Sequence, residues 1–106
     1  MILGVLNQRV DLHRLGRTAV GGDLQVVETF ADLQALVQGK QEQMSDHDGR
    51  EVTANAVVFL AADAPIDTSR ETWRIEWDGR HWEVVAVFKE IDAATGLVHH
   101  IKLGIR

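Results

Sequence analysis

Residues 73–88 decide the fold, and they read Trp73-Arg-Ile-Glu-Trp-Asp-Gly-Arg-His-Trp-Glu-Val-Val-Ala-Val-Phe88. The dipeptide Asp78-Gly79 lies between two runs in which apolar and polar residues alternate. Both central residues of a type I′ turn need positive φ, and Asp-Gly is one of the pairs that accept it most readily. The stretch therefore predicts a β-hairpin with a two-residue loop.

This turn also predicts which residues of the two strands lie opposite each other. The expected pairs are Trp77 with Arg80, Glu76 with His81, Ile75 with Trp82, Arg74 with Glu83, and Trp73 with Val84. Side chains alternate along a strand, so the apolar residues gather on one face. These residues are Trp73, Ile75, Trp77, Trp82 and Val84. On the other face, the Arg74–Glu83 and Glu76–His81 pairs can attract each other across the strands.

Composition limits the classes of protein that this chain can belong to. Its 106 residues are enough for one domain, residues 1–106, with a modest core. The net charge of -5 argues against a dedicated nucleic-acid binder, and the lack of cysteine excludes disulfides and thiolate metal sites. No apolar run approaches the ~20 residues of a membrane span, and Met1–Leu6 is too short for a signal peptide. We therefore expect a soluble protein that is made in a cytoplasm.

The C-terminal half predicts a meander of about four strands, at Val52–Leu60, Trp73–Trp77, Trp82–Phe88 and Leu97–Ile105. A meander of this kind is completed most simply as a small antiparallel barrel or sandwich. The expected fold class is therefore all-β, with a long internal loop and at most one short helix.

The N-terminal half is less clear. Val10–Leu15 predicts a first strand, and the glycine-rich segment Gly16–Asp23 predicts a loop. Leu24–Met44 can be interpreted in two ways. Apolar residues recur at three- and four-residue spacing from Val26 to Val37, which slightly favours a helix. The alternative is two short strands in the same segment.

A polar segment separates the two halves. Its characteristic residues are Lys40, Glu42, Met44, Asp46, His47, Asp48, Gly49, Arg50 and Glu51. A two-residue turn at Asp48-Gly49 would place Asp46 opposite Glu51, and like charges in that position are unfavourable. We therefore expect a longer loop, at about residues 39–52.

No arrangement of residues predicts catalysis, a cofactor or a metal ion. The adjacent residues His99 and His100 would point to opposite faces of a strand, and His81 could meet one of them only across neighbouring strands. Neither serine lies in a nucleophile motif, and no phosphate-binding loop is present. The residues themselves indicate a small β domain without enzymatic activity, and its polar loop and apolar N-terminus are more natural in a subunit of an assembly.

Beyond these local features, the order and spacing of several motifs resemble a known family. Asp67 is followed by Trp73–Val87, a turn and His99-His100-Ile-Lys-Leu103, and the chain opens with Leu6-Asn-Gln-Arg-Val-Asp-Leu-His-Arg14. Together with Leu36-Val-Gln38, these segments resemble the head-tail joining proteins of long-tailed bacteriophages. The nearest group is the head-completion or stopper proteins of the connector. Their pattern is a strand ending in Asp-Gly, an aromatic residue, Glu-Val-Val, a turn and a closing strand.

The resemblance implies a structural virion protein of the phage neck, made in the host cytoplasm and without enzymatic residues or cofactors. It implies a ring of roughly six or twelve copies. Adaptor or portal proteins would lie on the head side, and tail-terminator or tail-tube proteins on the tail side. The ring would close the filled head, retain the DNA and later let it pass without sequence-specific binding. No membrane is involved.

The resemblance also implies that Gly39–Val52 projects toward the channel as a gating loop, and that Leu33–Met44 is mainly strand. An acidic loop would repel DNA phosphates, and the acids are Glu42, Asp46, Asp48 and Glu51. Two alternatives remain open. One is a tail terminator or another ring protein of the neck. The other is a small barrel that binds single-stranded nucleic acid by stacking bases on Trp73, Trp77 and Trp82.

Overall fold

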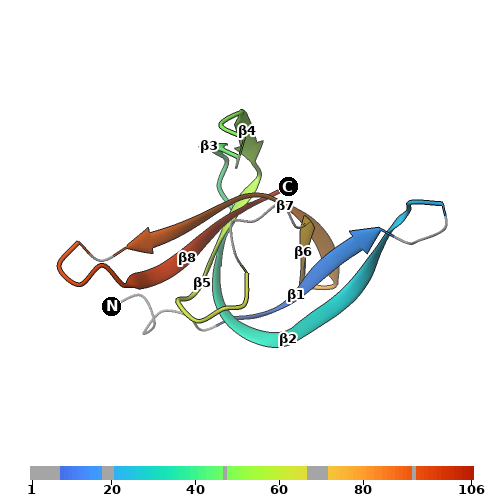
Figure 1. Cartoon of the computed structure of the whole chain (residues 1–106), viewed down its shortest axis with the longest axis horizontal. Coiled ribbons are helices and arrows are strands. Elements are labelled where there is room, and N and C mark those ends of the chain that lie inside the picture. The colour runs from blue at the N-terminus through green and yellow to red at the C-terminus, as the bar shows by residue number, and fades with distance from the viewer. Residues whose placement is uncertain (1–7, 18–20, 47, 67–71, 92) are drawn as a thin grey trace.

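The structure is a computed structural model that describes residues 8–17, 21–46, 48–66, 72–91 and 93–106. These residues form strands, turns and irregular connections, and none of them lies in a helix that could cross a membrane. Figure 1 shows the strands in chain order. They are β1 (Gln8–Arg17), β2 (Leu24–Gln38), β3 (Glu42–Ser45), β4 (Glu51–Ala54), β5 (Ala56–Ala61), β6 (Thr72–Trp77), β7 (Arg80–Ile91) and β8 (Val98–Ile105).

Six of the strands close into a barrel in the order β1-β2-β5-β8-β7-β6. Every pair is antiparallel, and β1 completes the ring by pairing with β2 on one side and β6 on the other. The remaining strands, β3 and β4, pair only with each other. The all-β prediction is therefore confirmed, and so is the expected barrel-like architecture.

The tryptophan hairpin forms β6 and β7 with the predicted turn. Asp78 has φ 54° and Gly79 has φ 74°, as a type I′ turn requires. Four of the five expected pairs are present, from Trp77 with Arg80 to Arg74 with Glu83, whereas Trp73 with Val84 is not part of the register. The local sequence is thus sufficient to set the register of this hairpin.

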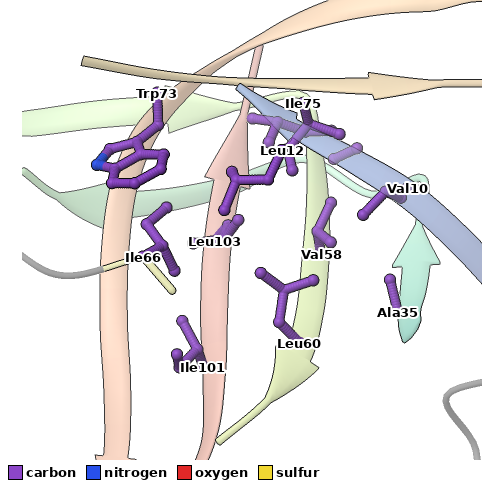
Figure 2. Close-up of a cluster of buried hydrophobic side chains, with 12 residues drawn as sticks. Val10, Leu12, Ala35, Val58, Leu60, Ile66, Trp73, Ile75, Ile101 and Leu103 are labelled. Carbon is purple, nitrogen blue, oxygen red and sulfur yellow. The ribbon is translucent and has the colours of Figure 1, made fainter. Parts of the chain in front are cut away.

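The face of the hairpin that carries the tryptophans forms part of the barrel core. Trp73 is 4% exposed and Ile75 is completely buried, and they pack with side chains from the other strands of the barrel (Figure 2). Trp77, Trp82 and Val84 are partly buried against the same core cluster. Its buried members are Val10, Leu12, Ala35, Ala56, Val58, Leu60, Ile66, Trp73, Ile75, Ile101, Leu103 and Ile105.

On the outward face of the hairpin, the charged side chains pair with residues other than the predicted ones. Arg74 and Glu83 lie opposite each other in the register, but Glu83 forms its ion pair with Arg106, at 3.2 Å. Glu76 lies opposite His81, but its hydrogen-bond partner is His13 of β1. The predicted pairs consider the hairpin alone, whereas the actual partners come from β1 and from Arg106, directly after β8.

The helix that the spacing favours for Leu24–Met44 is wrong, because β2 is a single strand from Leu24 to Gln38. The reason is a β-bulge opposite Asp11, where β2 carries one residue more than β1. Asp32 adopts φ 63° there, and its N–H donates to Asp11 Oδ1 over 2.8 Å. The extra residue places both Phe30 and Leu33 against the core although they are three apart, which imitates helical spacing.

The expected strand Val52–Leu60 is divided in two at Asn55. Residues Glu51–Ala54 leave the barrel as β4, and Ala56–Ala61 enter it as β5. The Asn55 N–H donates to the carbonyl oxygen of Ile105, which ties the break to the end of β8. The apolar pattern continues across the break, so the sequence does not show where the chain changes sheets.

Two isoleucines test how strongly the structure depends on the barrel core. Ile75 is completely buried and Ile91 is 63% exposed. We expect Ile75→Ala to lower the free energy of unfolding by about 2–5 kcal/mol, because it removes buried methyl groups and leaves a cavity. The matched variant Ile91→Ala should change it by less than about 0.5 kcal/mol. Urea unfolding measures both, and equal losses would contradict this assignment of the core.

Candidate functional site

The polar segment between the two halves is a second hairpin that stands off the barrel (Figure 1). Strand β3 pairs with β4 from Glu42 opposite Ala54 to Ser45 opposite Glu51. The expectation of a continuous loop over about residues 39–52 is therefore corrected, because residues 42–45 and the segment from Glu51 onward are strands, whereas residues 39–41 are irregular as expected. The expectation of more than two turn residues is confirmed, since residues 46–50 connect the strands.

Asp46 organises the turn of this hairpin. Its Oδ1 atom accepts the N–H groups of Asp48 and Arg50, at 3.0 and 2.9 Å. The Arg50 guanidinium lies 3.5 Å from Asp46 Oδ2 and 3.1 Å from Asp48 Oδ2, and Gly49 provides the positive φ that the turn needs. His47 lies outside the described residues. The described residues of the turn are thus held together by their own side chains.

The base of the hairpin rests on the outer surface of the barrel. Met44 and Ala54 are buried there with Ala86 of β7, and together they form a second apolar cluster. Gly104 of β8 lies directly beneath them, and a Cβ atom at this position would collide with Met44 Sδ and approach Ala54 Cβ to 3.1 Å. The absence of a side chain at Gly104 therefore allows the hairpin to approach the barrel.

An ion-pair network fastens the same base. Lys102 Nζ lies 2.6 Å from Glu42 Oε2, and Lys40 Nζ lies 3.6 Å from Glu42 Oε1. The hydrogen bond from Lys102, helped by the charges of both lysines, holds the pKa of Glu42 below its usual value against a smaller opposing effect of burial. Ionised Glu42 is therefore stabilised in the folded hairpin.

Ion pairs compensate much of the negative charge that the acidic residues give this hairpin. Glu42 is neutralised by lysines, and Asp46 and Asp48 share Arg50. Of the four acids, Glu51 is the one that forms no ion pair with a described residue, and it is exposed. A negative surface on this hairpin would therefore be centred on Glu51 and the partly compensated Asp48.

Exposed apolar residues mark two other places on the surface. Leu24, Val26 and Val27 are 40–47% exposed on β2, next to the β1–β2 turn. Ile91 and Leu97 are 63% and 69% exposed around the β7–β8 turn. Figure 1 shows these two hairpins extending to opposite ends of the long axis of the molecule, which measures 47 Å. We refer to Leu24, Val26 and Val27 as the β1–β2 tip, and to Ile91 and Leu97 as the β7–β8 tip.

The structure places the histidines and tryptophans that the sequence singled out in different surroundings. His81 does not meet His100, which lies opposite Glu90 at the other end of β7 and packs against Phe59; the side chain of His99 is outside the described part of the chain. His81 lies instead beside His13 of β1. The pairing of β1 with β6 brings them together, and no local spacing signals it. Trp73 is buried in the core, and Trp77 and Trp82 are partly buried against it.

Comparison with known proteins gives no family for this chain. No family model matches it, and no similar protein is found among curated sequences. Its function must therefore be inferred from the geometry of the chain and from the motifs in its sequence.

Gly104 provides a test of how the hairpin is attached. We expect Gly104→Ala to destabilise the protein by about 1–3 kcal/mol, because the new methyl group meets Met44 and Ala54. The second substitution Met44→Ala should restore part of this loss by making room. Gly39→Ala is the matched control, since nothing lies within 4 Å of a Cβ there. Thermal unfolding measures these changes, and an equal drop in melting temperature for both glycine variants would contradict this packing.

The Glu42–Lys102 pair makes attachment of the hairpin dependent on pH. Because the pKa of Glu42 is lowered in the folded state, its ionisation stabilises the fold above the usual glutamate pKa of 4.5, and this stabilisation is lost as the pH falls through the lower folded pKa. We expect Glu42→Gln to cost less than about 1 kcal/mol at pH 7, as for pairs near a surface. The difference from the wild type in urea unfolding should shrink below pH 4.5. A difference that is constant over this range would contradict the assignment.

Proposed function

We propose that the chain is a structural ring subunit of a bacteriophage neck, of the stopper type, located between the portal–adaptor complex and the tail. Three features support this proposal. The sequence carries the ordered motifs described above, the fold is a small antiparallel barrel, and the surface has two apolar tips at opposite ends. The ring closes the filled head, retains its DNA and offers a platform for the tail.

The pair of apolar tips is the observation that carries the proposal. Apolar side chains that are this exposed, gathered at particular places, are typical of protein–protein contacts. The two tips differ in sequence and lie at opposite ends of the molecule (Figure 1). When one surface of a subunit binds a different surface of the next copy, the contact repeats and closes into a ring if the rotation allows it. We infer that the β1–β2 tip of one subunit contacts the β7–β8 tip of its neighbour.

The β3–β4 hairpin is the segment proposed to face the channel. It leaves the barrel between the two tips, as Figure 1 shows, so it stays free when the tips are engaged. Its exposed end carries Glu51 and Asp48, and negative charge repels the phosphates of passing DNA. The organised turn and the anchored base make the hairpin suited to hold a fixed position in an assembled ring.

The ring contact is tested with one charged substitution at each tip. We expect the wild type to assemble at high concentration, and Leu24→Asp and Leu97→Asp each to remain monomeric, because a buried, unpaired charge opposes association. Size-exclusion chromatography with light scattering measures the assembly state. Thr53→Asp, at an exposed position on β4 in the hairpin that stays free of the tips, should assemble as the wild type does.

Mixing the two variants distinguishes the arrangement. Each retains the tip that the other has lost, so an equimolar mixture should form dimers joined by one intact contact, without closing a ring. If each tip bound its own counterpart in another copy, Leu97→Asp alone would still dimerise through its β1–β2 tip. That result, or a ring formed by either single variant, would contradict the proposed contact.

A further inference from the structure

A cluster of two histidines and a glutamate lies on the outer wall of the barrel. His13 belongs to β1, Glu76 to β6 and His81 to β7. Leu12 and Ile75, their neighbours along the chain, point into the core, so alternation directs His13 and Glu76 outward. One potential ligand atom from each of the three residues lies within 4.8 Å of the other two.

His13 is held in a defined orientation. It is only 8% exposed, and its two ring nitrogens have different partners. Nδ1 lies 2.9 Å from Thr29 Oγ1, and Nε2 lies 3.1 Å from Glu76 Oε2. A hydrogen bond at one ring nitrogen that orients the other is the arrangement commonly found behind metal-binding histidines. Nε2 of His13 therefore points toward the position where a shared ion would lie.

The other two residues can move to complete a site. The His81 ring lies against the His13 ring, with centroids 6.1 Å apart and an angle of 26° between planes, and His81 is exposed. Glu76 is also partly exposed. In a tetrahedral zinc site with bonds of about 2.0–2.1 Å, ligand atoms are about 3.3 Å apart. Rotation of the exposed side chains by up to about 1.5 Å at the ligand atoms reaches this spacing from the observed one.

We propose that His13 Nε2, Glu76 and His81 bind one divalent transition-metal ion of the zinc type. Two imidazoles and one carboxylate form a donor set that suits zinc, and they leave a fourth position for water. When the ion binds, the proton of neutral His13 lies on Nδ1, where the Thr29 hydroxyl accepts it, and Nε2 donates its lone pair to the metal. No redox step or other reactant is required.

The neighbouring charges affect how the ion binds, and the strands that carry its ligands indicate a structural role. Arg74 lies opposite His13 in the register and opposes the cation, whereas Asp11, opposite Glu76, favours it. The ligands come from β1 and from the β6–β7 hairpin, which are the strands that close the barrel. The bound ion therefore joins the first strand of the barrel to its central hairpin, and its binding raises the thermal stability of the folded chain.

The test is isothermal titration of metal-free protein with zinc chloride, together with thermal unfolding with and without zinc. We expect one zinc ion per chain and a higher melting temperature. His81→Ala and Glu76→Gln, both at partly or fully exposed positions, should weaken binding at least tenfold and remove the thermal shift. Thr29→Val should weaken it by about 10–100-fold through the orientation of His13 alone.

The control is His100→Ala, a histidine outside the cluster, which should bind zinc as the wild type does. Circular dichroism of each variant verifies the fold, so that weak binding is not confused with unfolding. The proposal is overturned if the wild type shows no saturable binding near one equivalent. It is equally overturned if zinc binds His81→Ala and Glu76→Gln as tightly as it binds the wild type, since other residues would then hold the ion.

Discussion

The Asp78-Gly79 turn sets the register of β6 and β7, and the two faces of the barrel wall depend on that register. With positive φ at both residues, the turn directs Trp73 and Ile75 inward and Glu76 and His81 outward. A slip by one residue would exchange the faces, exposing the apolar side chains and burying the polar ones. One short-range constraint thus determines both the core that stabilises the barrel and the cluster that is proposed to bind a metal ion.

Elements that depend on local interactions could be predicted from the sequence, whereas elements that depend on contacts between distant residues could not. The tryptophan hairpin was predictable because its turn, its alternation and its register are all local. The path of β2 was not, because the bulge at Asp32 depends on a hydrogen bond to Asp11 in another strand and changes which residues share a face. The attachment of the β3–β4 hairpin depends on Gly104 and Lys102, which are distant in sequence. The role of a glycine or lysine at such a position cannot be predicted until its contact partner is known.

The same contrast between local and long-range interactions applies to the candidate sites. The polar residues of the β3–β4 hairpin could be identified as a group, but not the ion pairs that compensate most of their charge. The cluster of His13, Glu76 and His81 could not be predicted, because His13 is 63 residues from Glu76 and approaches it only when β1 closes the barrel. The apolar tips follow from burial, since Leu24 and Leu97 are not distinguished from core leucines by their sequence context. Closure of the barrel and exposure at its ends are properties of the whole chain.

These features give each part of the molecule a separate task in the proposed assembly. The core maintains the barrel, the two tips contact neighbouring copies, and the β3–β4 hairpin is left free to face the channel. The most direct measurement of the central claim is the location of the protein in a phage lysate that contains both filled heads and free tails. After separation in a density gradient and detection by mass spectrometry, the account predicts that the protein accompanies filled heads that lack tails, as well as complete virions. Its presence with free tails, or its absence from all particles, would contradict the account.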